Sequence, residues 1–161
     1  MDTPRGLAVP VLKNVQNKSL MDIAQELAEL QAAGAAGKLS EDQLRGCTFS
    51  LSNIGSIGGT YAVPVVTPPQ VAIGAIGRMQ LLPRYRMDIG DGGVGQLASP
   101  EAVLGTRGLS GTGALKMVPT AVLFVSWSAD HRIVDGATVA RFSSTWKGYL
   151  ESPSKMLFTL R

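Results

Sequence analysis

The residues best suited to chemistry lie in the stretch SWSADHRIVDG, residues 126–136. It contains His131, the only histidine of the chain, and an Asp-Gly pair begins four residues later. An imidazole titrates near neutral pH, so it can take a proton from a hydroxyl or a thiol without strong tuning. Asp130, Arg132 and Asp135 are near enough in sequence to brace such a base. Two interpretations stay open: a catalytic base, or a surface histidine at a strand end with Asp135 capping the next helix.

Other signatures of catalysis or metal binding are missing. The sequence has no G-x-S-x-G elbow, no Walker loop and no H-E-x-x-H pair. Gly90, Gly92 and Gly95 have the G-x-G-x-x-G spacing, but no apolar strand precedes them and no helix pattern follows, so we expect a flexible loop there. Cys47 is the single cysteine, which excludes an internal disulfide and, with one histidine, a structural zinc site.

Two elements would position His131. The run TAVLFVSWS, residues 120–128, is continuously apolar, which predicts one strand buried on both faces. After Asp135, apolar residues recur at steps of three and four, which predicts an amphipathic helix; they are Val139, Phe142, Trp146 and Tyr149. The histidine would project from the turn between this strand and this helix, where a rigid scaffold can hold a functional side chain.

The rest of the chain alternates helices and strands. Ser19 predicts the N-cap of a helix that ends at Gly34, and Ser40 with Gln43 predicts a further short turn. Residues 6–15 are expected to form an edge strand or an extended segment. Strands are expected at 47–55, half-buried with Phe49 and Leu51 on one side, and at 71–77, buried on both faces. A last short helix or turn follows Pro153. Residues 86–118 are rich in glycine and lack periodicity, so we expect a flexible insertion there.

Composition limits the class of protein. The chain has 161 residues, 45% of them apolar and 17% charged, which is typical of one globular domain. No apolar window is long enough to span a membrane, and the first residues do not resemble a targeting segment. The net charge of +3 comes without a basic stripe. We therefore expect a soluble protein that binds neither membranes nor nucleic acid.

Three blocks of sequence resemble one family. DHRIVDG is similar to the H-x-x-x-D-G signature of the CoA-dependent acyltransferases, which include chloramphenicol acetyltransferase and the dihydrolipoamide acyltransferase cores of 2-oxoacid dehydrogenase complexes. FSLSNIGSIGGTYAVPVVTPPQVAIGAIG is similar to the central segment of those cores, and MDTPRGLAVPVLKNV to a third block. The sequences of the three blocks are most similar to the branched-chain form of the acyltransferase. The resemblance covers nearly everything except residues 86–118.

This resemblance implies a fold and a reaction. The fold would be α/β, a chloramphenicol acetyltransferase-like mixed sheet flanked by helices. Residues 1–161 would be the C-terminal portion of the catalytic domain, with its N-terminal part missing. The reaction would pass a branched-chain acyl group between dihydrolipoamide and coenzyme A. The alternative is a truncated, catalytically silent fragment or scaffold remnant of that core.

The resemblance also assigns residues. His131 would deprotonate the attacking thiol, Ser52 would donate a hydrogen bond to the oxyanion, and Asp135 would order the loop. Ser52 could instead be a strand-terminal hydroxyl that satisfies a turn. The coenzyme A tunnel would be lined by Asp2, Gln31, Ser52, Asn53, Ser56, Gly77 and Met79. Coenzyme A would be a substrate, the lipoyl group would come on a separate domain, and no metal is expected.

Assembly is the last implication. The family forms homotrimers and larger cores, in which His131 of one subunit would face Ser52 of its neighbour. Its partners are the decarboxylase and dihydrolipoamide dehydrogenase components. The protein would work in the mitochondrial matrix of a eukaryote or in the cytoplasm of a bacterium.

Overall fold

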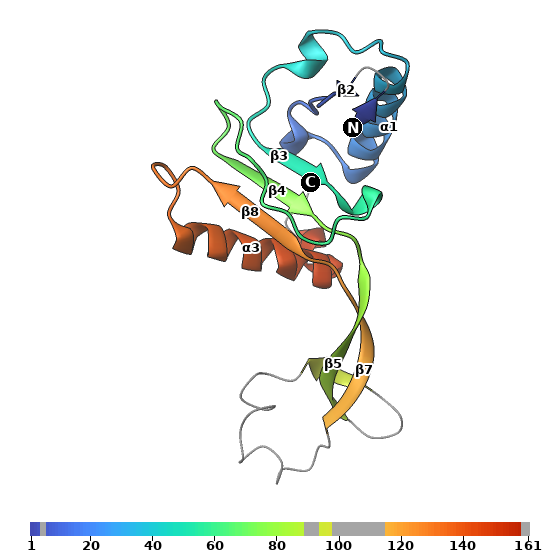
Figure 1. Ribbon diagram of the computed structural model, residues 1–161, viewed down its shortest axis with the longest axis vertical. Coiled ribbons are helices and arrows are strands. Elements are labelled where there is room, and N and C mark those ends of the chain that lie inside the picture. Colours follow the sequence, from blue (N-terminus) through green and yellow to red (C-terminus); the bar gives the residue numbers. More distant parts are fainter. Residues whose placement is uncertain (4–5, 89–93, 98–114, 159–161) are drawn as a thin grey trace. The chain divides into compact units, whose positions relative to one another are not determined.

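The computed structural model describes residues 1–3, 6–88, 94–97 and 115–158 (Figure 1). The chain divides into two compact units. The first comprises Met1–Ser52, Val63–Gly74 and Trp127–Arg161, and the second comprises Asn53–Ala62 and Ala75–Ser126. The strands are β1 (Asp2–Thr3), β2 (Gly6–Leu7), β3 (Ser50–Asn53), β4 (Ala72–Ile76), β5 (Gln80–Asp88), β6 (Val94–Leu97), β7 (Leu115–Val122) and β8 (Val125–Ala129). The helices are α1 (Leu20–Ala35), α3 (Gly136–Glu151) and the short 3-10 helices Val15–Asn17, Asp42–Leu44, Gly55–Ile57 and Pro153–Phe158.

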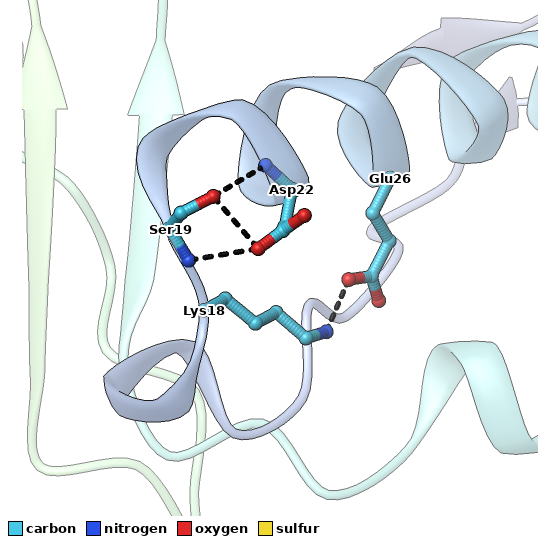
Figure 2. A network of polar contacts seen from close by, with 4 residues as sticks. All are labelled: Lys18, Ser19, Asp22 and Glu26. Carbon is cyan, nitrogen blue, oxygen red and sulfur yellow. Dashed lines mark hydrogen bonds and ion pairs between the residues drawn. The ribbon is translucent and has the colours of Figure 1, made fainter. Parts of the chain in front are cut away.

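Helix α1 begins as predicted at its N-cap, Ser19. The Asp22 backbone N–H donates to the Ser19 hydroxyl oxygen at 3.2 Å, and the Ser19 N–H donates to the Asp22 carboxylate at 3.0 Å (Figure 2). Lys18 forms an ion pair with Glu26 one turn further on. The two hydrogen bonds between Ser19 and Asp22 satisfy backbone N–H groups that the start of a helix leaves without a partner.

The predicted end of α1 is wrong. Gly34 lies inside the helix, which continues to Ala35. Gly34 is buried, and a Cβ atom there would be 2.5 Å from the Met1 sulfur and 3.3 Å from a Leu39 methyl. The glycine therefore serves close packing against Met1 and Leu39 rather than helix termination.

Strands β3, β4 and β8 form one sheet, in the order β3-β4-β8 (Figure 1). The strand predicted at 47–55 is shorter, and its burial is reversed: Ser50 and Ser52 are half-buried, whereas Leu51 is 56% exposed. The hydroxyl side is held because Ser50 donates to the Gln70 side-chain oxygen at 2.6 Å. In β4, only Gly74 and Ala75 are fully buried, so its predicted burial on both faces holds for its centre alone.

Strands β6, β5 and β7 form an antiparallel sheet in the second unit. The β5–β7 register runs from Gln80↔Val122 to Met87↔Leu115. The single strand predicted at 120–128 is therefore wrong, because β7 ends at Val122 and β8 starts at Val125. The chain leaves its partner β5 between these residues, and β8 pairs with β4 instead.

The prediction that residues 86–118 lack regular structure is also wrong in part, because β5 and β7 extend into this range and β6 lies within it. Arg86 pairs with Lys116 across the β5–β7 ladder, and Arg86 also pairs with Leu97 of β6. Gly95, expected in a flexible loop, lies in β6. The prediction gave weight to the many glycines and overlooked the alternation of polar and apolar residues in the segments on either side of them. Residues 89–93 and 98–114, which include Gly90 and Gly92, lie outside the described residues.

The remaining elements agree with the expectations in part. The capping pair of Ser40 and Gln43 is present, and Pro153 begins the last short helix. The edge strand expected at 6–15 is reduced to Gly6–Leu7, which pairs with β1. The core is small, since the buried apolar side chains among the described residues are Val11, Leu30 and Ala75. No described helix has the length and apolar character needed to cross a membrane.

Candidate functional site

His131 lies on a tight turn between β8 and α3. The turn is closed by backbone bonds, because the N–H groups of Ile133 and Val134 both donate to the Asp130 carbonyl at 3.0 Å. The Asp130 N–H donates to the Val71 carbonyl at 2.9 Å, just before β4. His131 itself is exposed. The predicted place of His131, on a turn between a strand and a helix, is therefore confirmed, and the residue is exposed there.

Asp135 is the N-cap of α3. Its carboxylate accepts the Thr138 backbone N–H at 2.7 Å and the Thr138 hydroxyl at 3.1 Å. These bonds, the backbone bond first, lower the pKa of Asp135, and the nearby His131 adds a smaller effect in the same direction. Asp135 therefore stays ionised at neutral pH with both oxygens engaged. Such a carboxylate orders the turn rather than exchanging protons.

An aromatic cluster holds α3 against β8. The Trp127 ring centroid is 5.2 Å from that of Phe142 and 5.5 Å from that of Trp146, both edge-on. The indole N–H donates to the Ser143 hydroxyl at 3.0 Å, and Phe49 lies 6.2 Å from Trp127. Edge-to-face pairs of this kind stabilise beyond the area they bury. Sequence reasoning placed Phe142 and Trp146 on one helix face but missed Trp127 as their partner.

A small apolar hollow of about 210 Å³ lies beside the turn. Its lining includes residues from both sides of His131, with Ala129 before it and Val134 after it. The full lining is Phe49, Ala72, Trp127, Ser128, Ala129, Val134, Thr138, Val139 and Phe142. The hollow therefore favours hydrocarbon over polar groups.

The structure does not join Ser52 to His131. Ser52 is half-buried near the end of β3. Across the described part of the chain, neither side chain makes a hydrogen bond, with the other or with any group. Within one chain, the expected base, His131, and the expected oxyanion donor, Ser52, are therefore not joined by a hydrogen bond in the described residues.

The loop after β3 lies against the end of β4, within the second unit. The Ile54 N–H donates to the Ile76 carbonyl at 3.1 Å, and the Arg78 N–H donates to the Gly59 carbonyl at 2.8 Å. Two glycines allow this crossing: a Cβ at Gly77 would be 2.2 Å from the Thr60 carbonyl oxygen, and one at Gly55 would be 2.7 Å from Gly77. Main chain therefore touches main chain, which only glycine permits.

Some of the residues expected to line a coenzyme A tunnel lie in or next to this crossing. Gly77 is buried in it, which favours its packing role. Ser56 and Asn53 are exposed, and the Ser56 hydroxyl donates to the Asn53 carbonyl at 2.9 Å. Met79 is 67% exposed just beyond Gly77. Segments 53–56 and 77–79 thus belong to one local structure.

The other two expected residues lie in the first unit. Asp2 is exposed in β1, and Gln31 is exposed on α1. Nothing in the geometry of either residue distinguishes a ligand contact from an ordinary surface position. Among the residues described, no group of three or more His, Cys, Asp or Glu side chains could hold a metal ion.

Comparison with known proteins gives the family. A profile of the 2-oxoacid dehydrogenases acyltransferase (catalytic domain) family matches residues 1–158. The chain belongs to this family. The chain is 49% identical over all of its 161 residues to the lipoamide acyltransferase component of the branched-chain alpha-keto acid dehydrogenase complex of Bos taurus, and 38% identical to that of Arabidopsis thaliana. It spans 28% of the length of each of these two relatives.

Solved structures agree. The chain is similar to a dihydrolipoamide acetyltransferase of Azotobacter vinelandii, with a TM-score of 0.73 and 34% identity, over 97% of this chain and 53% of that one. It is also similar to the cubic core of a pyruvate dehydrogenase complex, with a TM-score of 0.74 and 33% identity, over 98% and 54% of the two chains. The α/β fold with a sheet flanked by helices, expected for this family, is therefore confirmed.

Proposed function

We propose that this chain forms part of a catalytic core that passes a branched-chain acyl group between dihydrolipoamide and coenzyme A. The observation that carries the proposal is the 49% identity, over the whole chain, to the bovine branched-chain component. The turn geometry supports it. In the Azotobacter vinelandii acetyltransferase, a histidine and an asparagine four positions later were investigated for their catalytic role, and His131 and Asp135 have the same spacing.

The chemistry follows from two side chains. The His131 imidazole takes the proton of the coenzyme A thiol, and the thiolate attacks the carbonyl carbon of the acyl-lipoamide thioester. The carbonyl oxygen becomes an oxyanion, to which the Ser52 hydroxyl donates a hydrogen bond. The intermediate then expels the lipoamide thiolate, which recovers the proton from His131. The products are acyl-coenzyme A and dihydrolipoamide, and no metal takes part.

The coenzyme A contacts are part of the proposal. Asn53, Ser56, Gly77 and Met79 would contact it from the glycine crossing. Ser52, Asp2 and Gln31 are further proposed contacts. The exposed hydroxyl and amide of Ser56 and Asn53 support the first group, because they are available to a ligand.

The site is proposed to be completed by a second copy. In a homotrimer, His131 of one subunit would face Ser52 of its neighbour, which agrees with the absence of a hydrogen bond between them in the described residues of one chain. The trimer would build a larger core that works with decarboxylase and dihydrolipoamide dehydrogenase components and with a lipoyl group on a separate domain. The mitochondrial relatives support a place in the matrix, if the source is a eukaryote.

Residues 86–118 are proposed to be an insertion relative to the family, with the strand ends described above. In the Azotobacter vinelandii protein the investigated serine precedes the histidine by 52 positions, whereas Ser52 precedes His131 by 79 positions. The additional 27 residues are accounted for if the chain between β5 and β7 is longer here.

A catalytically silent member of the core is the second candidate. It is favoured by the small core and by many exposed apolar side chains, such as Val63 at 89% and Leu7 at 80%. Such surfaces need a covering partner. A chain that keeps these surfaces without building a complete site would act in assembly alone.

One experiment separates the two candidates. The purified protein is sized by light scattering and assayed for acyl transfer from isovaleryl-coenzyme A and from acetyl-coenzyme A to dihydrolipoamide. We expect a trimer or larger assembly. His131→Ala should lower kcat about 10²- to 10⁴-fold, and Ser52→Ala about 10²- to 10³-fold. A preference of about tenfold or more for the branched substrate would support the acyl assignment. A monomer with no more activity than His131→Ala would contradict the proposal that this chain is catalytic and would favour the silent candidate.

A further inference from the structure

The residues on either side of His131 form an ion pair across it. Arg132 donates to both carboxylate oxygens of Asp130, from Nε at 2.9 and 3.2 Å and from Nη2 at 2.6 Å. The Arg132 backbone N–H also donates to the Asp130 carboxylate, at 3.0 Å. One carboxylate thus fixes both the main chain and the side chain of the residue that follows His131.

Asp130 is itself anchored on its other sides. Its N–H is bound to the Val71 carbonyl, and its own carbonyl accepts the N–H groups of Ile133 and Val134. Its side chain is 21% exposed, whereas that of Arg132 is 87% exposed. Asp130 is therefore held by the backbone on its inner side, and the Arg132 side chain covers it on the side that faces solvent. The hydrogen bonds from Arg132 lower the pKa of Asp130 to about 2, so the carboxylate stays charged at neutral pH.

The imidazole of His131 has no such support of its own. No hydrogen bond to its ring is found among the described residues, so its direction depends on the backbone at position 131. That backbone is held at position 130 by the sheet and at position 132 by the Asp130 carboxylate. A catalytic base misplaced by about 1 Å can lose about 10²-fold in rate, so this support matters.

We propose that Asp130 and Arg132 are positioning residues, which clamp the turn so that the His131 imidazole is presented in one orientation. The proposal rests on the assignment of His131 as the thiol base. The clamp requires the two parallel hydrogen bonds from the Arg132 guanidinium to the Asp130 carboxylate. Arg132→Lys would keep the positive charge but lose these bonds.

The chain offers a direct observation of this clamp. His131 is the only histidine, so its imidazole gives one set of carbon-bound proton signals in a ¹H–¹³C NMR spectrum, without any assignment step. We expect these signals to shift toward those of a free histidine in Arg132→Gln and in Asp130→Asn. Arg45→Gln is the matched control, because Arg45 also pairs with a carboxylate, that of the exposed Glu41, outside the turn.

Kinetics provide the second measurement. In the assembled enzyme, Arg132→Gln and Arg132→Lys should each lower kcat about tenfold with KM changed less than about twofold, and Arg45→Gln should change neither. Circular dichroism checks folding, and Arg132→Lys serves if Arg132→Gln does not fold. Imidazole signals in both Arg132 variants that match those of Arg45→Gln would overturn the clamp. If the unaltered protein shows no acyl transfer, the proposed function fails, while the NMR comparison still decides the clamp.

Discussion

The turn that carries His131 and the loop that carries Ser56 are held in place by different kinds of contact. Besides its backbone bonds, the turn is held by side chains: the Asp130 carboxylate, the Asp135 cap and the Trp127 cluster. Backbone holds the loop, where main chain crosses main chain at Gly55 and Gly77. Side-chain contacts can be weakened one at a time, whereas a backbone crossing has no spare volume. We therefore expect graded effects in the turn and severe effects at the crossing.

The largest effect is expected for Gly77→Ala. The new methyl group would be 2.2 Å from the Thr60 carbonyl oxygen, and backbone cannot move aside as a flexible side chain can. We expect the free energy of unfolding to fall by about 3 kcal/mol, measured by chemical denaturation. Gly148→Ala is the control: a Cβ there, inside α3, meets nothing within 4 Å. It should raise stability by about 0.5–1 kcal/mol. Equal stabilities of the two variants would contradict the crossing.

A smaller effect is expected in the aromatic cluster. Trp127 is half-buried, so Trp127→Ala should lower the free energy of unfolding by about 2 kcal/mol, less than for a fully buried ring. Trp127→Phe keeps ring packing and loses the hydrogen bond to Ser143, which should cost about 1 kcal/mol. Circular dichroism is the suitable measurement. If both substitutions cost the same, ring packing does not hold α3 on β8.

The smallest effect is expected for Asp135→Asn, and it concerns pH. The pKa of Asp135 in the folded protein is below its ordinary value of 3.8, so the stability it contributes is present above that value and is lost as the pH falls through the folded pKa. Asparagine caps helices about as well as aspartate but has no charge to lose.

We therefore expect Asp135→Asn to have nearly unchanged stability at neutral pH. It should lose less stability than the unaltered protein as the pH falls from about 5 through 3.8 and on through the folded pKa, in denaturation series at matched salt. Because Asp22 and Asp130 also have lowered pKa values, the comparison must be made as a difference between the two proteins. Identical pH dependence in both proteins would show that the cap does not depend on charge.

Sequence reasoning succeeded where the signal is local. The start of α1 at Ser19 and of α3 at Asp135 follow from residues within one helical turn, and both caps are present. The turn around His131 was predicted for the same reason, since a buried strand, a polar stretch and a helix follow one another directly.

It failed where a distant partner decides the outcome. The break between β7 and β8 depends on the pairing of β5 with β7 up to Val122. Gly34 was interpreted as a helix end, because its contact with Met1 cannot be deduced from its neighbours. For the site, the residues of the turn could be predicted, but the clamp formed by Asp130 and Arg132 depends on side-chain geometry that the spacing does not specify.

The β5–β7 ladder bears on how this gene can change. Met87 and Leu115 are paired at its far end, so the two ends of the intervening chain meet at a fixed place. Closing a longer chain there costs only about 0.6 kcal/mol for each doubling of its length. We therefore expect codons gained or lost between these positions, outside Val94–Leu97 of β6, to leave the β5–β7 register from Gln80 to Val122 intact. Length variation at this place in the gene would then disturb neither the β5–β7 pairing nor the turn that carries His131.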